Sequence, residues 1–177
     1  MAAVTDVFDN REAWAAHFAA GWLAYYQQTG ETKWDLYEHP RNRTAVGRAG
    51  ITLSQSRLLF ISSAGAYLPD QQPPYDAPNP LGDYDIRLIP SSTPLDQIAY
   101  AHTHYDHAAV DADPQVLMPL RHLEALVREK KIGALTENMI SFMGYQPDVI
   151  RVLDETIPPI LRAAKEQQAD AALLVPS

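Results

Sequence analysis

Arg57-Leu58-Leu59-Phe60-Ile61-Ser62-Ser63-Ala64-Gly65 is the stretch that decides the fold. Four large apolar residues occupy consecutive positions, a pattern typical of a strand that is covered on both faces. The small residues that follow let a ligand or another backbone approach closely, and crevices in open α/β sheets form at the carboxyl ends of strands. We therefore predict a central parallel strand followed by substrate-binding residues at Ser62, Ser63 and Gly65.

Further apolar strands alternate with helices along the chain. The patterns predict strands over 85–90, 97–101 and 171–175, and helices over 119–131 and 148–164, with the second helix kinked or split at Pro158 and Pro159. This alternation favours an α/β fold, a mostly parallel sheet flanked by helices in a Rossmann-like three-layer arrangement. A terminal parallel strand leaves an edge that needs cover, so we also expect a homo-oligomer.

The domain organisation predicted is a single α/β domain over 1–177. Within it, residues 1–50 form an N-terminal helix and a connecting segment, and residues 51–177 form the core. The aromatic stripe of the first helix recurs at helical spacing and is expected to face a core. Its members are Trp14, Phe18, Trp22 and Tyr25.

Composition excludes several classes of partner and chemistry. The 177 residues carry 22 acidic and 14 basic side chains and a net charge of -8, which disfavours nucleic acid as a partner. No apolar run is long enough to span a bilayer, and residues 1–6 lack the features of a signal peptide, so we expect a cytoplasmic protein with no membrane partner. The absence of cysteine removes disulfides, thiolate zinc sites and a cysteine nucleophile from this sequence.

A histidine cluster follows the predicted strand 97–101 and matches His-x-His-x-Asp-His. Its imidazoles and carboxylate are ligands that zinc or iron accepts, so the candidate metal ligands are His102, His104, Asp106 and His107. This hexapeptide resembles the motif of the metallo-β-lactamase superfamily, which implies a metal-dependent hydrolase, although His122 is the sole later histidine. The alternative is a polar loop whose histidines satisfy backbone groups. Because both loops follow strands assigned to one sheet, we expect this cluster beside the turn at 62–65.

A second resemblance covers residues 53–177, and it rests on the order and spacing of short segments. These are Leu53-Ser54-Gln55-Ser56-Arg57, Leu59 to Leu68, Pro74-Tyr75-Asp76, Gly82-Asp83, Arg87-Leu88-Ile89-Pro90, His104-Tyr105-Asp106-His107, Asp113, Met118 to Leu123, Ile132-Gly133-Ala134-Leu135, Ser141-Phe142-Met143-Gly144 and Asp170 to Pro176. In this respect the chain resembles the N-terminal part of the selenoprotein B family of glycine, betaine, sarcosine and D-proline reductases.

The resemblance implies a reductive reaction on a small amino-acid-like substrate. A selenol or thiol attacks the activated substrate, and the C–N bond is broken with electrons from a thioredoxin-type donor. The resemblance also implies other reductase subunits as partners. The nucleophile of that family lies shortly after the strand that 173–176 resembles. We therefore expect this chain to be the front part of a longer selenoprotein or cysteine homologue, inactive alone, with an in-frame UGA after codon 177.

The site roles implied by the resemblance fall on residues already singled out. His104 or His107 would act as general acid to the leaving amine, and Asp106 would orient the imidazole. Gly144, together with the small residues after the first strand, would form the substrate-binding wall. A non-enzymatic binding or assembly homologue is the remaining alternative.

Overall fold

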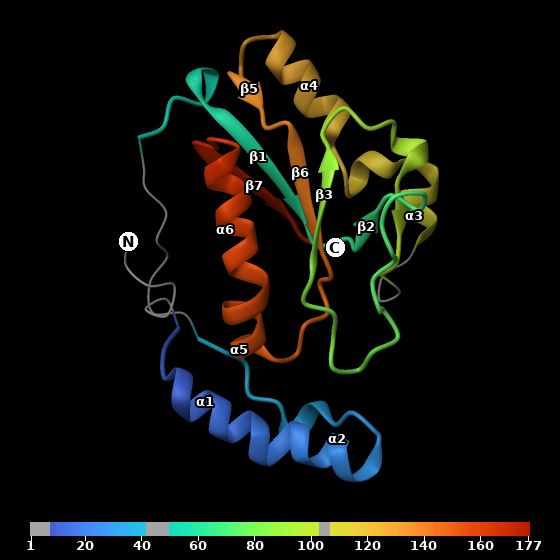
Figure 1. Ribbon diagram of the computed structural model, residues 1–177, viewed down its shortest axis with the longest axis vertical. Coiled ribbons are helices and arrows are strands. Elements are labelled where there is room, and N and C mark those ends of the chain that lie inside the picture. The colour runs from blue at the N-terminus through green and yellow to red at the C-terminus, as the bar shows by residue number, and fades with distance from the viewer. Residues whose placement is uncertain (1–7, 42–49, 103–106) are drawn as a thin grey trace.

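A five-stranded sheet forms the centre of the computed structural model, which describes residues 8–41, 50–102 and 107–177. The strands are β1 (Arg57–Ser62), β3 (Ile86–Pro90), β5 (Ala134–Leu135), β6 (Asn138–Phe142) and β7 (Ala171–Val175). β1 pairs in parallel with β5, β6 and β7, whereas β3 pairs antiparallel with β6 (Figure 1). The prediction of a central parallel strand after Ser56 is confirmed.

Helices cover both faces of the sheet. On one face, Leu59 and Ile61 of β1 pack with Ala163 of α6 (Ile157–Glu166). On the other face, Phe60 joins a cluster with Leu123 of α4 (Leu120–Arg128). The side chains of consecutive residues of β1 thus point to opposite faces of the sheet, and both faces are covered. This explains why the strand is apolar at four consecutive positions, Leu58 to Ile61. The predicted α/β class, with a mostly parallel sheet flanked by helices in one domain, is confirmed.

Several other elements are short. They are α3 (His107–Ala112), the two-residue strands β2 (Ala66–Tyr67) and β4 (Ala99–Tyr100), and 3₁₀ turns at Trp34–Leu36, Leu53–Gln55, Leu95–Gln97 and Pro114–Val116. Within the described residues, no helix combines the length and the apolar character needed to cross a membrane.

The predicted helix over 148–164 contains a wider turn instead of a sharp break. It begins as α5 (Val149–Arg151), passes through a π-helical turn over Val152–Thr156, and continues as α6. Pro158 and Pro159 therefore lie in the first turn of α6, where a missing backbone N–H is tolerated. The chain is helical on both sides of the π turn, so the helix is not split at the two prolines.

The N-terminal helix carries a ladder of stacked aromatic rings, but its last member is Tyr26 and not Tyr25. α1 (Arg11–Phe18) and α2 (Ala24–Thr29) are joined by a π-helical turn over Ala19–Leu23. Trp14, Phe18, Trp22 and Tyr26 stack in succession, with ring centroids 5.0, 5.4 and 6.0 Å apart. Four-residue steps drift around an α-helix of about 3.6 residues per turn, and the wider π turn offsets that drift. This compensation keeps the rings on one face.

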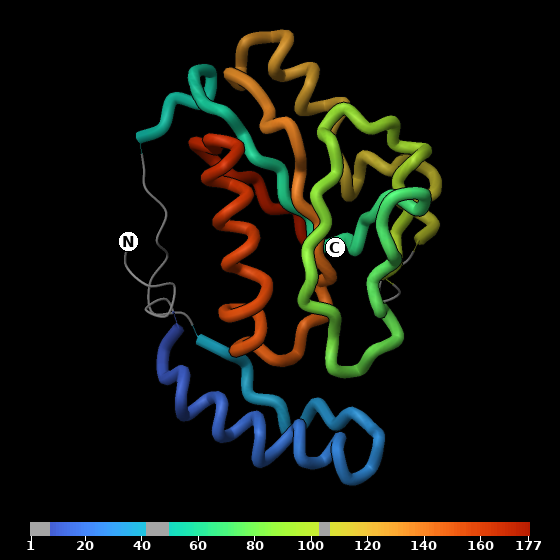
Figure 2. The backbone as a smooth tube through the Cα atoms, in the orientation of Figure 1, coloured from blue at the N-terminus to red at the C-terminus, as the bar shows by residue number. Residues whose placement is uncertain are grey.

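The N-terminal helical unit, residues 8–41, packs against the segment between β6 and α6. Its buried rings form one cluster with Leu153. The Tyr37 hydroxyl donates a hydrogen bond to the Pro147 carbonyl at 2.9 Å, and the Trp34 ring meets Tyr145 edge to face. Figure 2 shows this unit below the sheet, on the side to which β1 runs. The unit therefore lies at the carboxyl end of the parallel strands.

Candidate functional site

The turn after β1 leads directly into β2, which pairs antiparallel with β4. The sequence prediction that 97–101 is a strand of the main sheet is wrong, because only Ala99 and Tyr100 are paired and they belong to this separate two-stranded sheet. The pairing of β4 with β2 nevertheless places residue 101 beside the turn that follows β1, since the Ala101 N–H donates to the Gly65 carbonyl at 3.0 Å. His102 follows immediately.

Two glycines lie against His102 at the carboxyl ends of β1 and β6. A methyl group on Gly65 would lie 2.6 Å from the Met143 Sδ and 3.1 Å from the His102 backbone nitrogen. A methyl group on Gly144 would lie 3.1 Å from His102 Nε2 and 3.3 Å from Ser63 Oγ. The structure therefore brings together three of the predicted substrate-binding residues, Ser63, Gly65 and Gly144, with one member of the histidine cluster.

Ser63 also holds the segment that follows β7, a contact that sequence reasoning missed. The Ser177 backbone N–H donates to Ser63 Oγ at 2.9 Å, and the Ser177 hydroxyl donates to the Ser63 carbonyl at 2.9 Å. The Ser63 N–H in turn donates to the Val175 carbonyl at 3.2 Å. No local sequence signal links residues so far apart, but the adjacency of β1 and β7 requires their ends to meet.

Ser62 occupies a different environment from Ser63. It is fully buried, and its hydroxyl donates to the Leu117 carbonyl at 3.4 Å while it lies 3.3 Å from the Ala64 N–H, which donates to it. Strand alternation directs its side chain toward the α4 side of the sheet. Ser62 therefore forms the inner wall behind the turn.

The histidine loop is described at its two ends. His102 is buried, with 4% of its surface exposed. The His107 Nε2–H donates a hydrogen bond to the His102 carbonyl at 2.7 Å. His104 and Asp106 lie outside the described residues. Among the residues that the structure describes, no group of three or more His, Cys, Asp or Glu side chains could hold a metal ion. Two of the four predicted metal ligands lie outside the residues that the structure describes, so the zinc or iron site stays a prediction.

Tyr75 anchors the proline-rich excursion of residues 69–82 beside this site. Its hydroxyl donates to the Ser141 carbonyl at 2.8 Å, and the Arg87 guanidinium lies 4.4 Å from its ring centroid. Burial raises the pKa of the Tyr75 hydroxyl above its usual value, so the ring stays neutral. Ser141 also fixes the turn, because its hydroxyl accepts from the Ala66 N–H at 2.7 Å. The excursion is thus bonded to β6, which carries Gly144 at its end.

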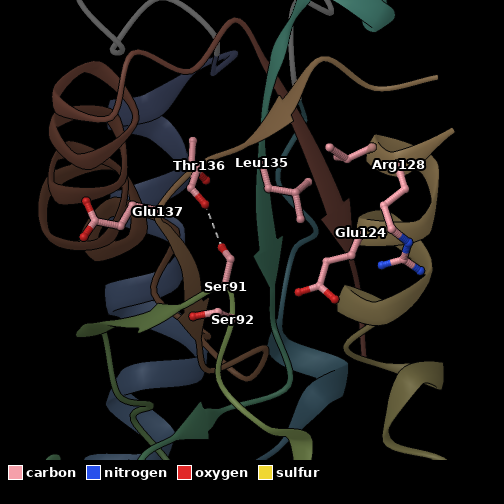
Figure 3. A pocket seen from close by; sticks show the side chains of 8 residues that line it. Ser91, Ser92, Glu124, Arg128, Leu135, Thr136 and Glu137 are labelled. Carbon is pink, nitrogen blue, oxygen red and sulfur yellow. Dashed lines mark hydrogen bonds between the residues drawn. The ribbon is translucent and has the colours of Figure 1, made fainter. Parts of the chain in front are cut away.

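Cavities lie at both ends of the sheet. One of about 200 Å³ adjoins Ser63 and is lined otherwise by apolar groups, including Phe142 and Leu174. A larger one, of about 490 Å³, lies at the amino ends of the parallel strands between α4 and the loop joining β5 to β6 (Figure 3). There the Ser91 hydroxyl donates to the Thr136 carbonyl. Ligand crevices in open α/β sheets form at carboxyl ends, so the smaller cavity is the one that belongs to the candidate site.

Tyr37 links the N-terminal helical unit to the loop that follows Gly144, and it yields a pH-dependent prediction. Burial, reinforced by Asp148 and Tyr145, raises the pKa of Tyr37 to about 12. This folded-state pKa is above the unfolded value of about 10. The neutral Tyr37 hydroxyl therefore contributes its full stabilisation of the folded protein below pH 10, and the contribution is lost as the pH rises toward 12. We expect Tyr37→Phe to lower the free energy of unfolding by about 1 kcal/mol at neutral pH, because the bond to Pro147 is removed.

The measurement is chemical unfolding of wild type and Tyr37→Phe at a series of pH values. The stability difference between the two proteins should shrink as the pH rises through about 10 to 12. A difference that stays constant across that range would contradict the assignment.

The fold and these contacts define a class: an α/β protein with a site of small residues and a histidine at the carboxyl ends of its parallel strands. The chain belongs to the glycine/sarcosine/betaine reductase selenoprotein B family, whose model matches residues 46–175. The match begins after the described N-terminal helical unit and includes every residue of the candidate site except Ser177.

One relative is the D-proline reductase subunit gamma of Acetoanaerobium sticklandii, which is 34% identical over 96 residues. The aligned region covers 54% of this chain and 40% of that relative, so the chain spans less than half of the relative's length. No solved structure matches the chain. The expected resemblance to the selenoprotein B family is confirmed.

Proposed function

We propose that this chain forms part of the substrate site of a reductase that breaks the C–N bond of a small amino-acid-like molecule. Glycine, sarcosine, betaine and D-proline define the substrate class. The observation that carries the proposal is the family match over 46–175, which includes Ser63, Gly65, His102 and Gly144.

The class of reaction determines which bonds change and which electrons and protons the site needs. One C–N bond is replaced by one C–H bond and one N–H bond, and a dithiol is oxidised to a disulfide to supply the two electrons and two protons. The attacking group must be a soft nucleophile that is ionised near neutral pH, such as a thiolate or selenolate. The 177 residues contain no cysteine, so this nucleophile must be supplied by residues other than these.

The roles proposed for this chain are therefore binding and proton delivery. Ser63, Gly65 and Gly144 line the site at the strand ends, with Ser62 behind them. His104 or His107 delivers the proton to the leaving nitrogen, and Asp106 orients the imidazole. A thioredoxin-type dithiol protein is the proposed electron donor, with further reductase subunits as partners, and such chemistry suits the reducing cytoplasm.

Calorimetric titration of the 177-residue chain with glycine, sarcosine, betaine and D-proline tests this proposal. We expect binding of at least one of the four, weakened about tenfold or more by Gly144→Val, since that side chain would meet His102 and Ser63. Gly30→Ala is the matched control, because its Cβ would meet nothing within 4 Å. Absence of binding by all four compounds, or equal affinity of wild type and Gly144→Val, would contradict the proposal.

A metal-dependent hydrolase is the alternative proposal, and the His-x-His-x-Asp-His motif is the observation that favours it. It requires that protein purified without chelator carry near-stoichiometric zinc or iron. Replacing His102 and His104 together by alanine should then release the metal. A metal content below about a tenth of an equivalent removes this alternative.

A further inference from the structure

A single hydrogen bond joins the two ends of the histidine loop. His107, the first residue of α3, donates from Nε2–H to the His102 carbonyl at 2.7 Å. A backbone carbonyl can only accept, so the hydrogen of this bond belongs to the His107 ring. In the neutral imidazole the other ring nitrogen, Nδ1, then carries no hydrogen. The bond therefore fixes both the orientation and the tautomer of the His107 side chain.

The residue that accepts this bond, His102, lies against the two glycines of the candidate site. The Ala101 N–H, one residue earlier, donates to the Gly65 carbonyl at 3.0 Å. A methyl group on Gly65 would lie 3.1 Å from the His102 backbone nitrogen, and one on Gly144 would lie 3.1 Å from His102 Nε2. His102 is 4% exposed, so in a close-packed interior it cannot shift without displacing one of the glycines. The position of His102 therefore determines how the two glycines are placed.

α3 gives His107 a fixed base. Val110 of α3 is 2% exposed, so this helix is packed into the domain. Leu117 follows α3 after one 3₁₀ turn, and its carbonyl accepts from the Ser62 hydroxyl at 3.4 Å. The His107 bond thus completes a ring of contacts that runs from the end of β1 through α3 to His102 and back to the turn after β1.

The same bond argues against His107 as the proton donor of the proposed reaction. A general acid must direct its hydrogen at the atom that it protonates, within hydrogen-bond reach. The Nε2 hydrogen of His107 is directed at a backbone carbonyl instead, and its transfer would break the bond that holds His102. The neutral ring has no second hydrogen to deliver, because Nδ1 carries none.

We propose that His107 is a positioning residue, which holds His102 against Gly65 and Gly144 and so keeps the substrate wall in place. The inference rests on the proposed function, because it takes the residues at the strand ends as that wall. Of the two histidines proposed for proton delivery, His104 is then the one that remains. A positioning role requires a hydrogen-bond donor at residue 107, whereas an acid role requires an imidazole.

Calorimetric titration of His107→Gln and His107→Ala with glycine, sarcosine, betaine and D-proline tests this difference. The amide N–H of glutamine can donate to the His102 carbonyl, whereas alanine has no donor. For any compound that the wild type binds, we expect His107→Ala to weaken the affinity about tenfold or more and His107→Gln to stay within about threefold. Equal weakening by the two variants, or no weakening by His107→Ala, overturns the proposal.

His122→Ala is the matched control for these variants. His122 is exposed on α4, and its hydrogen bond with Gln115 is made by the backbone N–H, which the substitution keeps. It should leave the affinity unchanged.

Nitrogen NMR of the ligand-free 177-residue chain is the second measurement, and it does not depend on substrate binding. At alkaline pH, where imidazoles are neutral, the wild-type spectrum should show the His107 hydrogen on Nε2. His107→Ala should displace the amide signals of Gly65 and Gly144, and His107→Gln should displace them much less. A hydrogen on Nδ1, or unchanged glycine signals in His107→Ala, overturns the positioning role even where substrates bind. Displaced glycine signals together with no binding of the four compounds would refute the proposed function alone.

Discussion

Gly65→Ala is expected to lower the free energy of unfolding by about 2 to 4 kcal/mol. Gly65 has a φ of 64°, a left-handed conformation that an alanine adopts only with strain. In addition, the new methyl group would lie 2.6 Å from the Sδ of Met143, which is 1% exposed and cannot swing into solvent. Its other neighbour is the His102 backbone, so relief would displace the start of the histidine loop.

Gly30→Ala separates the two contributions, because Gly30 has a similar φ of 73° but its Cβ would meet nothing within 4 Å. We expect this control to cost about 1 kcal/mol, the backbone part alone. Urea unfolding of both variants gives the comparison. Equal losses for the two variants would show that Gly65 is not held against Met143 and His102.

Trp22→Ala is expected to cost about 3 to 5 kcal/mol, the range for removing a large buried aromatic ring. Trp22 has no exposed surface, and its ring stacks between Phe18 and Tyr26. The vacated space would be enclosed by the N-terminal helix and by Leu153, which the same cluster contains. The substitution should therefore also destabilise the segment that connects β6 to α6.

Trp34→Ala is the control for Trp22→Ala, because Trp34 is 48% exposed. Its substitution should cost about 1 kcal/mol. The measurement is urea unfolding followed by tryptophan fluorescence and by circular dichroism in parallel. A loss below about 1 kcal/mol for Trp22→Ala, or separate transitions in the two signals, would show that residues 8–41 are not integral to the domain.

Three of the five strands of the sheet, β1, β3 and β7, could be predicted from the sequence, whereas β5 and β6 were not predicted. β1 is apolar from Leu58 to Ile61 since both faces are covered. β3 was predicted as a strand from its alternation, but its burial does not follow that alternation, because Leu88 is exposed and Ile89 is buried. β4 could not be predicted in the same way, because two paired residues leave too short a pattern to show which sheet they join. The shift from Tyr25 to Tyr26 depends on a π turn, which has no local sequence signal in Ala19–Leu23.

The candidate site was predicted in part. Small residues after β1 indicated Ser63 and Gly65, and the family resemblance implied Gly144. The structure places Gly65 and Gly144 against His102, and Gly144 against Ser63. The pattern did not show that Ser62 faces inward, because that depends on the phase of the strand at its last residue. It also gave no sign of the bonds between Ser63 and Ser177, which depend on the pairing of distant strands. The catalytic roles of His104, Asp106 and His107 remain proposals.

The central claim is that small amino-acid-like substrates bind at the carboxyl ends of the parallel strands. Nuclear magnetic resonance of the isotope-labelled 177-residue chain, titrated with glycine, sarcosine, betaine and D-proline in turn, tests it most directly. The account predicts that the largest shifts of backbone amide signals fall at residues 63–65, in 102–107 and at Gly144, with little change around the cavity at Ser91 and Thr136. Shifts concentrated at that amino-end cavity, or no shifts with any of the four compounds, would contradict it.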